Sequence, residues 1–76
     1  MSIAFILINT DIYKKSKVLA LLKNIPEVEK AWLVSGVYDI IAKVKIGTGP
    51  PFQDPTCRRI RQLNGVTSTI TMKVVG

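Results

Sequence analysis

The chain of 76 residues contains no histidine, a single cysteine and only five acidic residues. Without histidine it lacks the commonest general base and the commonest side-chain ligand of metal ions. The single cysteine, Cys57, excludes an internal disulfide bond. No pair of residues has the spacing of a metal site, and no glycine-rich phosphate-binding loop follows a strand. The sequence therefore predicts a protein that is not an enzyme and that needs no metal or cofactor.

Cys57 is the one candidate nucleophile. It precedes Arg58 and Arg59, whose positive charges would lower the pKa of a neighbouring thiol. A cysteine that acts as a nucleophile also needs a base to take its proton, and no histidine is present for that role. An incidental cysteine, on the surface of a helix or partly buried, is therefore the favoured interpretation.

Long hydrophobic segments are also absent. No apolar run approaches the roughly 18 residues that a membrane-spanning helix requires. The apolar segment 3–8 has no basic region before it and no small-residue cleavage site after it, so it does not have the layout of a signal peptide. These features predict a cytoplasmic protein with no membrane partner.

Positive charge is what the sequence has in excess, with eleven basic residues and a net charge of +6. One interpretation is a basic module that binds nucleic acid through its phosphates. The other is a solvated basic surface that keeps the protein in solution. The basic residues are spread over every segment, and only Arg58-Arg59-x-Arg61 is dense, which favours the second interpretation.

The spacing of apolar residues predicts two helices and four strands. A helix over 13–23 has apolar residues at three- and four-residue spacing and ends before Pro26. A second helix lies within 52–64: either Asp54 is the N-cap of a short helix that starts at Pro55, which is the favoured interpretation, or an irregular turn begins near Phe52. Its inner side is predicted to hold Phe52, Thr56, Ile60 and Leu63. The strands are predicted over residues 3–9, 28–35, 38–46 and 66–75, with a reversal at Gly36 and a loop over 47–51.

Alternation of side chains assigns a face to each strand residue. In 38–46 the apolar face is the clearest, with Tyr38, Ile40, Ala42, Val44 and Ile46. In 28–35 one face is predicted to hold Val28, Trp32 and Val34. In 66–75 one face is predicted to hold Val66, Ile70, Met72 and Val74.

The order of elements predicts an α+β fold of the ferredoxin-like βαββαβ type. A weak repeat supports two similar halves, because segments 23–28 and 61–66 both end a helix, turn and enter a strand with valine. Right-handed crossovers place both helices on one face of a four-stranded antiparallel sheet. The other face carries too many apolar side chains to stay bare, so we expect the protein to dimerise through it.

Two segments are candidates for binding a ligand. In the hairpin, Gly36 permits a sharp reversal, Tyr38 offers an apolar wall with one hydroxyl, and Asp39 can accept from an ammonium group. An ordinary turn with a locally bonded aspartate is the alternative. The segment 67–71 is rich in hydroxyl groups that suit either a polar ligand or a half-exposed strand. An aromatic RNA-binding platform is a weaker alternative, because the central strands offer only Phe5 and Tyr38.

The order and spacing of several short motifs resemble the ligand-binding domain of the Lrp/AsnC, or feast/famine, transcriptional regulators, known as the RAM domain. The motifs are Gly36-x-Tyr38-Asp39-Ile40, Ile60-x-x-Leu63-x-Gly65-Val66-x-x-Thr69-x-Thr71, the opening Ala4–Ile8 and the turn Ile25–Val28. The likeness extends over nearly the whole chain. It differs at the start of the second helix, where GTGPPFQDP stands in place of a longer helix.

The resemblance implies a function. Members of the family bind amino acids or related effectors between subunits, and the effector shifts the higher-order assembly. The resemblance assigns ligand contacts to Gly36, Tyr38 and Asp39 and, on the facing strand, to Ser68, Thr69 and Thr71. It also implies a homodimer that forms higher oligomers, alone or together with full-length relatives. Residues 1–76 are expected to form a single domain without a helix-turn-helix, so no direct contact with DNA is expected.

Overall fold

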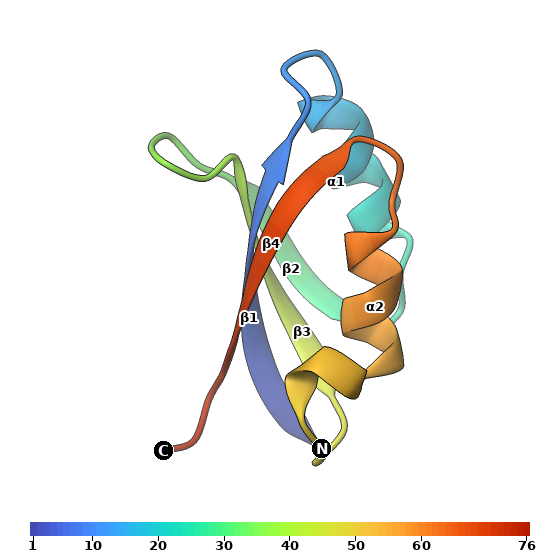
Figure 1. Ribbon diagram of the computed structural model, residues 1–76, viewed down its shortest axis with the longest axis vertical. Helices are drawn as coiled ribbons and strands as arrows, with labels where there is room; N and C mark the ends of the chain where they lie inside the picture. Colours follow the sequence, from blue (N-terminus) through green and yellow to red (C-terminus); the bar gives the residue numbers. More distant parts are fainter.

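The structure, a computed structural model of all 76 residues, has the predicted order of elements (Figure 1). The helices are α1 (Lys15–Lys23) and α2 (Pro55–Arg61), and a single 3₁₀ turn, η1 (Pro51–Gln53), precedes α2. The strands are β1 (Ser2–Thr10), β2 (Val28–Leu33), β3 (Ile40–Ile46) and β4 (Val66–Lys73). All strand pairs are antiparallel, in the order β2-β3-β1-β4. The predicted α+β, ferredoxin-like βαββαβ fold is confirmed.

Both helices pack on one face of the sheet and leave the opposite face, here called the open face, uncovered (Figure 1). The core lies between the helices and the central strands β1 and β3. Burying a large apolar side chain stabilises a fold by about 1.5–3 kcal/mol, so this layer holds most of the stability. Its members, each at most 2% exposed, are Ala4, Ile6, Ile8, Val18, Leu22, Ile25, Ile40, Ala42, Val44, Ile46, Cys57 and Ile60.

The two helix-to-strand turns have the same hydrogen bonding, which agrees with the repeat seen in the sequence. After α1, the N–H of Val28 donates to the carbonyl oxygen of Ile25 at 3.0 Å. After α2, the N–H of Val66 donates to the carbonyl oxygen of Leu63 at 3.1 Å. The two halves therefore enter β2 and β4 in the same way.

Each of these strands then shifts register one residue after its valine. In β2, Val28 pairs with Val44 but Lys30 pairs with Lys43, so Glu29 is an extra residue. An extra residue of this kind is a β-bulge, and it reverses the faces that simple alternation predicts beyond it.

The same irregularity occurs at the start of β4. Val66 pairs with Thr10 while Ser68 pairs with Asn9, so Thr67 is the extra residue. The two strands thus share a bulge as well as a turn, a symmetry that the sequence repeat did not reveal.

The bulges correct two predictions about strand faces. Val28 and Val66 pack against the core, on the helix side. Trp32 and Ile70 lie on the open face, because their partners Ile41 and Leu7 alternate with core residues. The prediction that Val28 shares a face with Trp32, and Val66 with Ile70, was wrong because simple alternation takes no account of a bulge.

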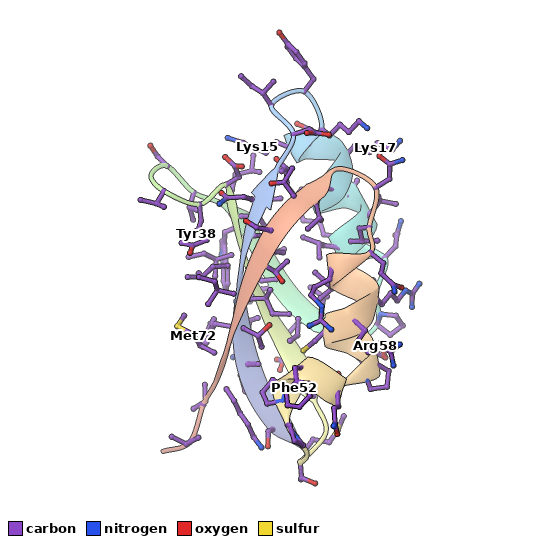
Figure 2. All side chains as sticks on the ribbon, viewed as in Figure 1. Lys15, Lys17, Tyr38, Phe52, Arg58 and Met72 are labelled. Atoms are coloured by element: carbon purple, nitrogen blue, oxygen red, sulfur yellow. The ribbon has the colours of Figure 1, made fainter.

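The second helix begins as predicted. Oδ1 of Asp54 accepts from the N–H groups of Thr56 at 2.9 Å and Cys57 at 3.4 Å, so Asp54 is the N-cap of a helix that starts at Pro55. Phe52 was predicted to face the core, and this is wrong: it lies in η1 with 67% of its surface exposed (Figure 2). The 3₁₀ turn does not continue the helical spacing that places Cys57 and Ile60 inward.

Candidate functional site

The hairpin between β2 and β3 forms one exposed end of the molecule. Gly36 has a φ of +143°, a conformation that residues with a Cβ rarely adopt, and it explains the reversal of the chain. Apart from Gly36 itself and its two neighbours in the chain, no heavy atom comes within 4 Å of the position where a Cβ would lie. The tip at Gly36 is therefore open to a ligand or to another subunit.

Tyr38 follows on the open face, so the prediction that it shares a face with Ile40 was wrong: β3 begins only at Ile40, and strand alternation does not extend back to Tyr38. Figure 2 shows its side chain on the same side of the sheet as Met72, away from both helices. The residue is half-buried. Its ring therefore extends the apolar surface of the open face toward the hairpin.

Asp39 links three segments of the chain. Its Oδ2 accepts from the backbone N–H of Thr10 at 2.9 Å and lies 3.4 Å from the hydroxyl oxygen of the same residue. Its Oδ1 lies 3.4 Å from Nζ of Lys15, the first residue of α1. The hydrogen bond from Thr10 lowers the pKa of the Asp39 carboxyl below its ordinary value; partial burial opposes this shift, and Lys15 adds to it. Asp39 is therefore an anion that holds the end of β1 and the start of α1, and the alternative interpretation, an aspartate bonded locally within the turn, is wrong.

The hydroxyl-bearing residues of β4 divide between the two faces of the sheet. Ser68 pairs with Asn9, and the side-chain amide of Asn9 lies 3.4 Å from the Ser68 hydroxyl. Thr69 and Thr71 pair with the core residues Ile8 and Ile6, so they point to the helix side. Within one chain the six predicted ligand residues do not form one cluster.

The end of β1 lies between the two parts of the predicted site. Thr10 binds Asp39 of the hairpin on one side, and the neighbouring Asn9 contacts Ser68 of β4 on the other. The sequence patterns assigned no functional role to Asn9, Thr10 or Lys15. The available signal was the abrupt change from six apolar residues, 3–8, to a polar pair at the end of β1.

Thr69 and Thr71 line a separate, open hollow of about 340 Å³ beside α2. Pro51, Phe52 and Arg61 complete its wall, and Nη2 of Arg61 donates to the carbonyl oxygen of Phe52 at 3.1 Å. The hollow is open to solvent, so one chain alone does not enclose a small molecule there.

The open face is organised in rows of residues that run across all four strands. One row is entirely apolar: Trp32, Ile41, Leu7 and Ile70. The next row is half cationic: Lys30, Lys43, Phe5 and Met72. Trp32, Ile70 and Met72 are each more than 40% exposed. An apolar surface of this kind, rimmed by lysines, is typical of a protein–protein interface.

Cys57 does not fit the role of a nucleophile. It is 1% exposed, and burial raises the pKa of its thiol above the ordinary value, with a further increase from the carboxylate of Asp54. The suggestion that the adjacent arginines lower this pKa is wrong, because both of them are exposed at the surface while the thiol lies in the core.

No three residues of the metal-binding types lie together, and no helix is long and apolar enough to cross a membrane.

Comparison with known proteins shows the family to which the whole chain is similar. Residues 3–75 match the family described as the Lrp/AsnC ligand binding domain. Among curated proteins, none matches the sequence significantly. Among solved structures, FFRP-DM1 is 35% identical, and the match covers 99% of this chain and 100% of that one with a TM-score of 0.88.

Two further structures agree. The hypothetical protein PHS023 from Pyrococcus horikoshii is 35% identical over 99% of this chain and 90% of its own, with a TM-score of 0.85. E. coli AsnC is 24% identical and supports the fold alone; it matches 99% of this chain with 51% of its own length, at a TM-score of 0.83. The chain therefore belongs to the Lrp/AsnC ligand-binding domain family, a family of regulatory domains that are not enzymes.

Proposed function

We propose that residues 1–76 act as a cytoplasmic module that senses an amino acid or a related small effector by changing its oligomeric assembly. The observation that carries the proposal is the family match over residues 3–75. The module contributes to transcription regulation either as a homo-oligomer or by mixing with full-length relatives that carry a DNA-binding domain.

The placement of the six candidate residues supports a site between subunits. Gly36 and Tyr38 lie at the exposed hairpin, whereas Thr69 and Thr71 point to the helix side of an edge strand. A single chain offers only open hollows in these regions, so enclosing a ligand requires surface from a second subunit. Binding then favours one assembly over another, because the ligand contacts both subunits only in that assembly.

The open face supports a dimer as the first step of assembly. Its apolar row crosses the full width of the sheet, and water covers it in the isolated chain. Each square ångström of apolar surface removed from water contributes about 25 cal/mol, so pairing two such faces is strongly favourable. A 76-residue domain has a small core, and dimerisation adds to its stability.

Asp39 supplies the most specific contact of the proposed site. Its Oδ2 is held by Thr10, while Oδ1 is engaged only by the flexible ammonium group of Lys15. The Asp39 side chain remains 28% exposed. The ammonium group of an effector can therefore replace Lys15 at Oδ1 without disturbing the end of β1.

The test is to measure the melting temperature and the native mass with and without each of the twenty amino acids. At least one amino acid should raise the melting temperature and change the particle mass. In Asp39→Asn both responses should weaken, because the anionic partner of the ligand is lost. Asp11→Asn is the matched control, since Asp11 is exposed and makes only a 3.9 Å ion pair with Lys14. If no amino acid changes either quantity, the proposal of amino-acid sensing fails.

A further inference from the structure

The two helices form an outer layer with charge of one sign. The sequences of α1 and α2, KSKVLALLK and PTCRRIR, contain six basic residues and no acidic one. All five acidic residues of the chain lie outside the helices, in turns, in the hairpin or at the start of β2. The outer face of the helices, called here the helix face, is therefore a cationic surface.

Most of these charges have no partner within the chain. Only two ion pairs form, Lys14 with Asp11 at 3.9 Å and Lys15 with Asp39 at 3.4 Å. Figure 2 shows Lys17 and Arg58 on the helix side, away from the open face. The residues on the helices that are exposed and without a carboxylate within 4 Å are Lys17, Lys23, Arg58, Arg59 and Arg61.

Helix stability explains only part of this pattern. Positive charge near the C-terminal end of a helix is favourable, which suits Lys23 and the arginines of α2. Lys17 lies in the first turn of α1, where positive charge is unfavourable. No acidic residue occurs in the first turn of either helix. The charge of Lys17 is therefore not explained by the stability of α1, and attraction to an anion outside the chain would explain it.

We propose that the helix face binds double-stranded DNA through its phosphates, without reading the base sequence. The molecule is 34 Å long, which corresponds to about ten base pairs of duplex at 3.4 Å per pair. The family resemblance implied no direct contact with DNA. The exposed cations of the helix face argue against that expectation, because phosphate contacts need no helix-turn-helix. The helix face is opposite to the open face, so assembly through the open face leaves it accessible.

The number of unpaired cations sets the expected salt dependence. Five phosphate contacts predict that the logarithm of affinity falls with the logarithm of salt concentration with a slope of about −4.5. Affinity should then fall by about 500-fold between 50 and 200 mM salt. A triple variant, Lys17→Gln, Arg58→Gln and Arg59→Gln, leaves two contacts, so the slope should fall in magnitude to about 2.

The measurement is fluorescence anisotropy of a labelled 20-base-pair duplex titrated with the protein at several salt concentrations. The matched control is Lys30→Gln, Lys43→Gln and Lys45→Gln, which removes the same charge from the open face. The control variant should keep most of the slope of log affinity against log salt concentration. The double variant Arg58→Lys, Arg59→Lys, which conserves the charge, should keep all of that slope. Thermal unfolding confirms that each variant is folded.

Three results would overturn the proposal. One is no binding at 50 mM salt, which would make the helix face a solvated surface. Another is an equal loss of affinity for the duplex in both triple variants, which would mean that net charge alone attracts DNA. The third is displacement of the duplex by polyglutamate of equal charge as effectively as by unlabelled duplex, which would indicate an acidic protein as the partner. None of these outcomes depends on whether an amino acid changes the assembly.

Discussion

The two faces of β3 show how one strand serves two purposes. On the helix side its residues Ile40, Ala42, Val44 and Ile46 are at most 1% exposed. On the open face the intervening residues are Ile41, Lys43 and Lys45, which water reaches. The period of two along a strand lets adjacent residues take part in different interactions, one in the core and one at a surface.

Because one face of the sheet is buried and the other is exposed, the helix side determines the stability of the single chain and the open face is available for assembly. The helix side of the sheet is fully packed within one chain, because the helices cover it and no polar side-chain atom is buried without a hydrogen-bond partner. The open face has an apolar row and a half-cationic row and remains uncovered. Substitutions on the two faces should therefore differ in size and in their dependence on protein concentration.

The largest effect is expected from Ile6→Ala, on the helix side of β1. The side chain is 1% exposed, and truncating a buried isoleucine costs about 2–5 kcal/mol. Urea unfolding should show this loss at every protein concentration. In a domain of this size, such a loss leaves little of the total stability.

The neighbouring substitution Leu7→Ala sharpens the comparison, because Leu7 lies on the open face. Its effect should be smaller in dilute protein and should grow as the concentration rises, since the proposed dimer would bury Leu7. Equal losses for the two variants, independent of concentration, would contradict the proposed division between the faces.

The next largest effect is expected from Gly65→Ala, at the turn into β4. Gly65 has a φ of +103°, and an added Cβ would lie 2.9 Å from Cβ of Lys14 and 3.0 Å from Cγ2 of Val18. Backbone strain and this overlap together should cost about 2–3 kcal/mol. Gly36→Ala carries the strain without the overlap, so the shift in melting temperature should be smaller.

A smaller loss is expected when the cap of α2 is removed. In Asp54→Ala the N–H groups of Thr56 and Gly47 lose their acceptor, and such caps contribute about 0.5–2 kcal/mol. Asp11→Ala removes only an exposed ion pair and should cost less than about 0.5 kcal/mol. Denaturant midpoints measured side by side would reveal whether the two aspartates differ as stated.

The smallest effect concerns acid stability at the site. The pKa of Asp39 is lower in the folded chain than in the unfolded one, where it is near 3.8. Its contribution is therefore fully present well above pH 3.8 and is lost as the pH falls through the folded value. Asp39→Asn should flatten this part of the curve of stability against pH between neutral pH and pH 3. An unchanged curve would mean that the contacts of Asp39 with Thr10 and Lys15 contribute nothing to folding.

The fold was largely predictable because its signals are local. The N-cap at Asp54 depends on residues within three positions, and the apolar spacing of α1 depends on a single helix. Within β2 and β4, simple alternation assigned the residues after each bulge to the right faces relative to one another, but not relative to the valine before it. A bulge arises from pairing with another strand, so the sequence of one strand does not reveal it. For the same reason, the contact of Asp39 with Thr10 could not be foreseen across 29 residues of sequence.

The sequence by itself determined the order of elements, the excess of positive charge and the absence of catalytic histidine, because these follow from composition and from contacts between near neighbours. The tertiary structure alone decided the rest. Strand pairing set the rows of the open face, and packing placed Thr69 and Thr71 away from Tyr38. The arrangement of α1 and α2 on one side of the sheet placed six of the eleven basic residues, three from each helix, on the same side of the molecule. Such features depend on which distant residues become neighbours, and only folding establishes that.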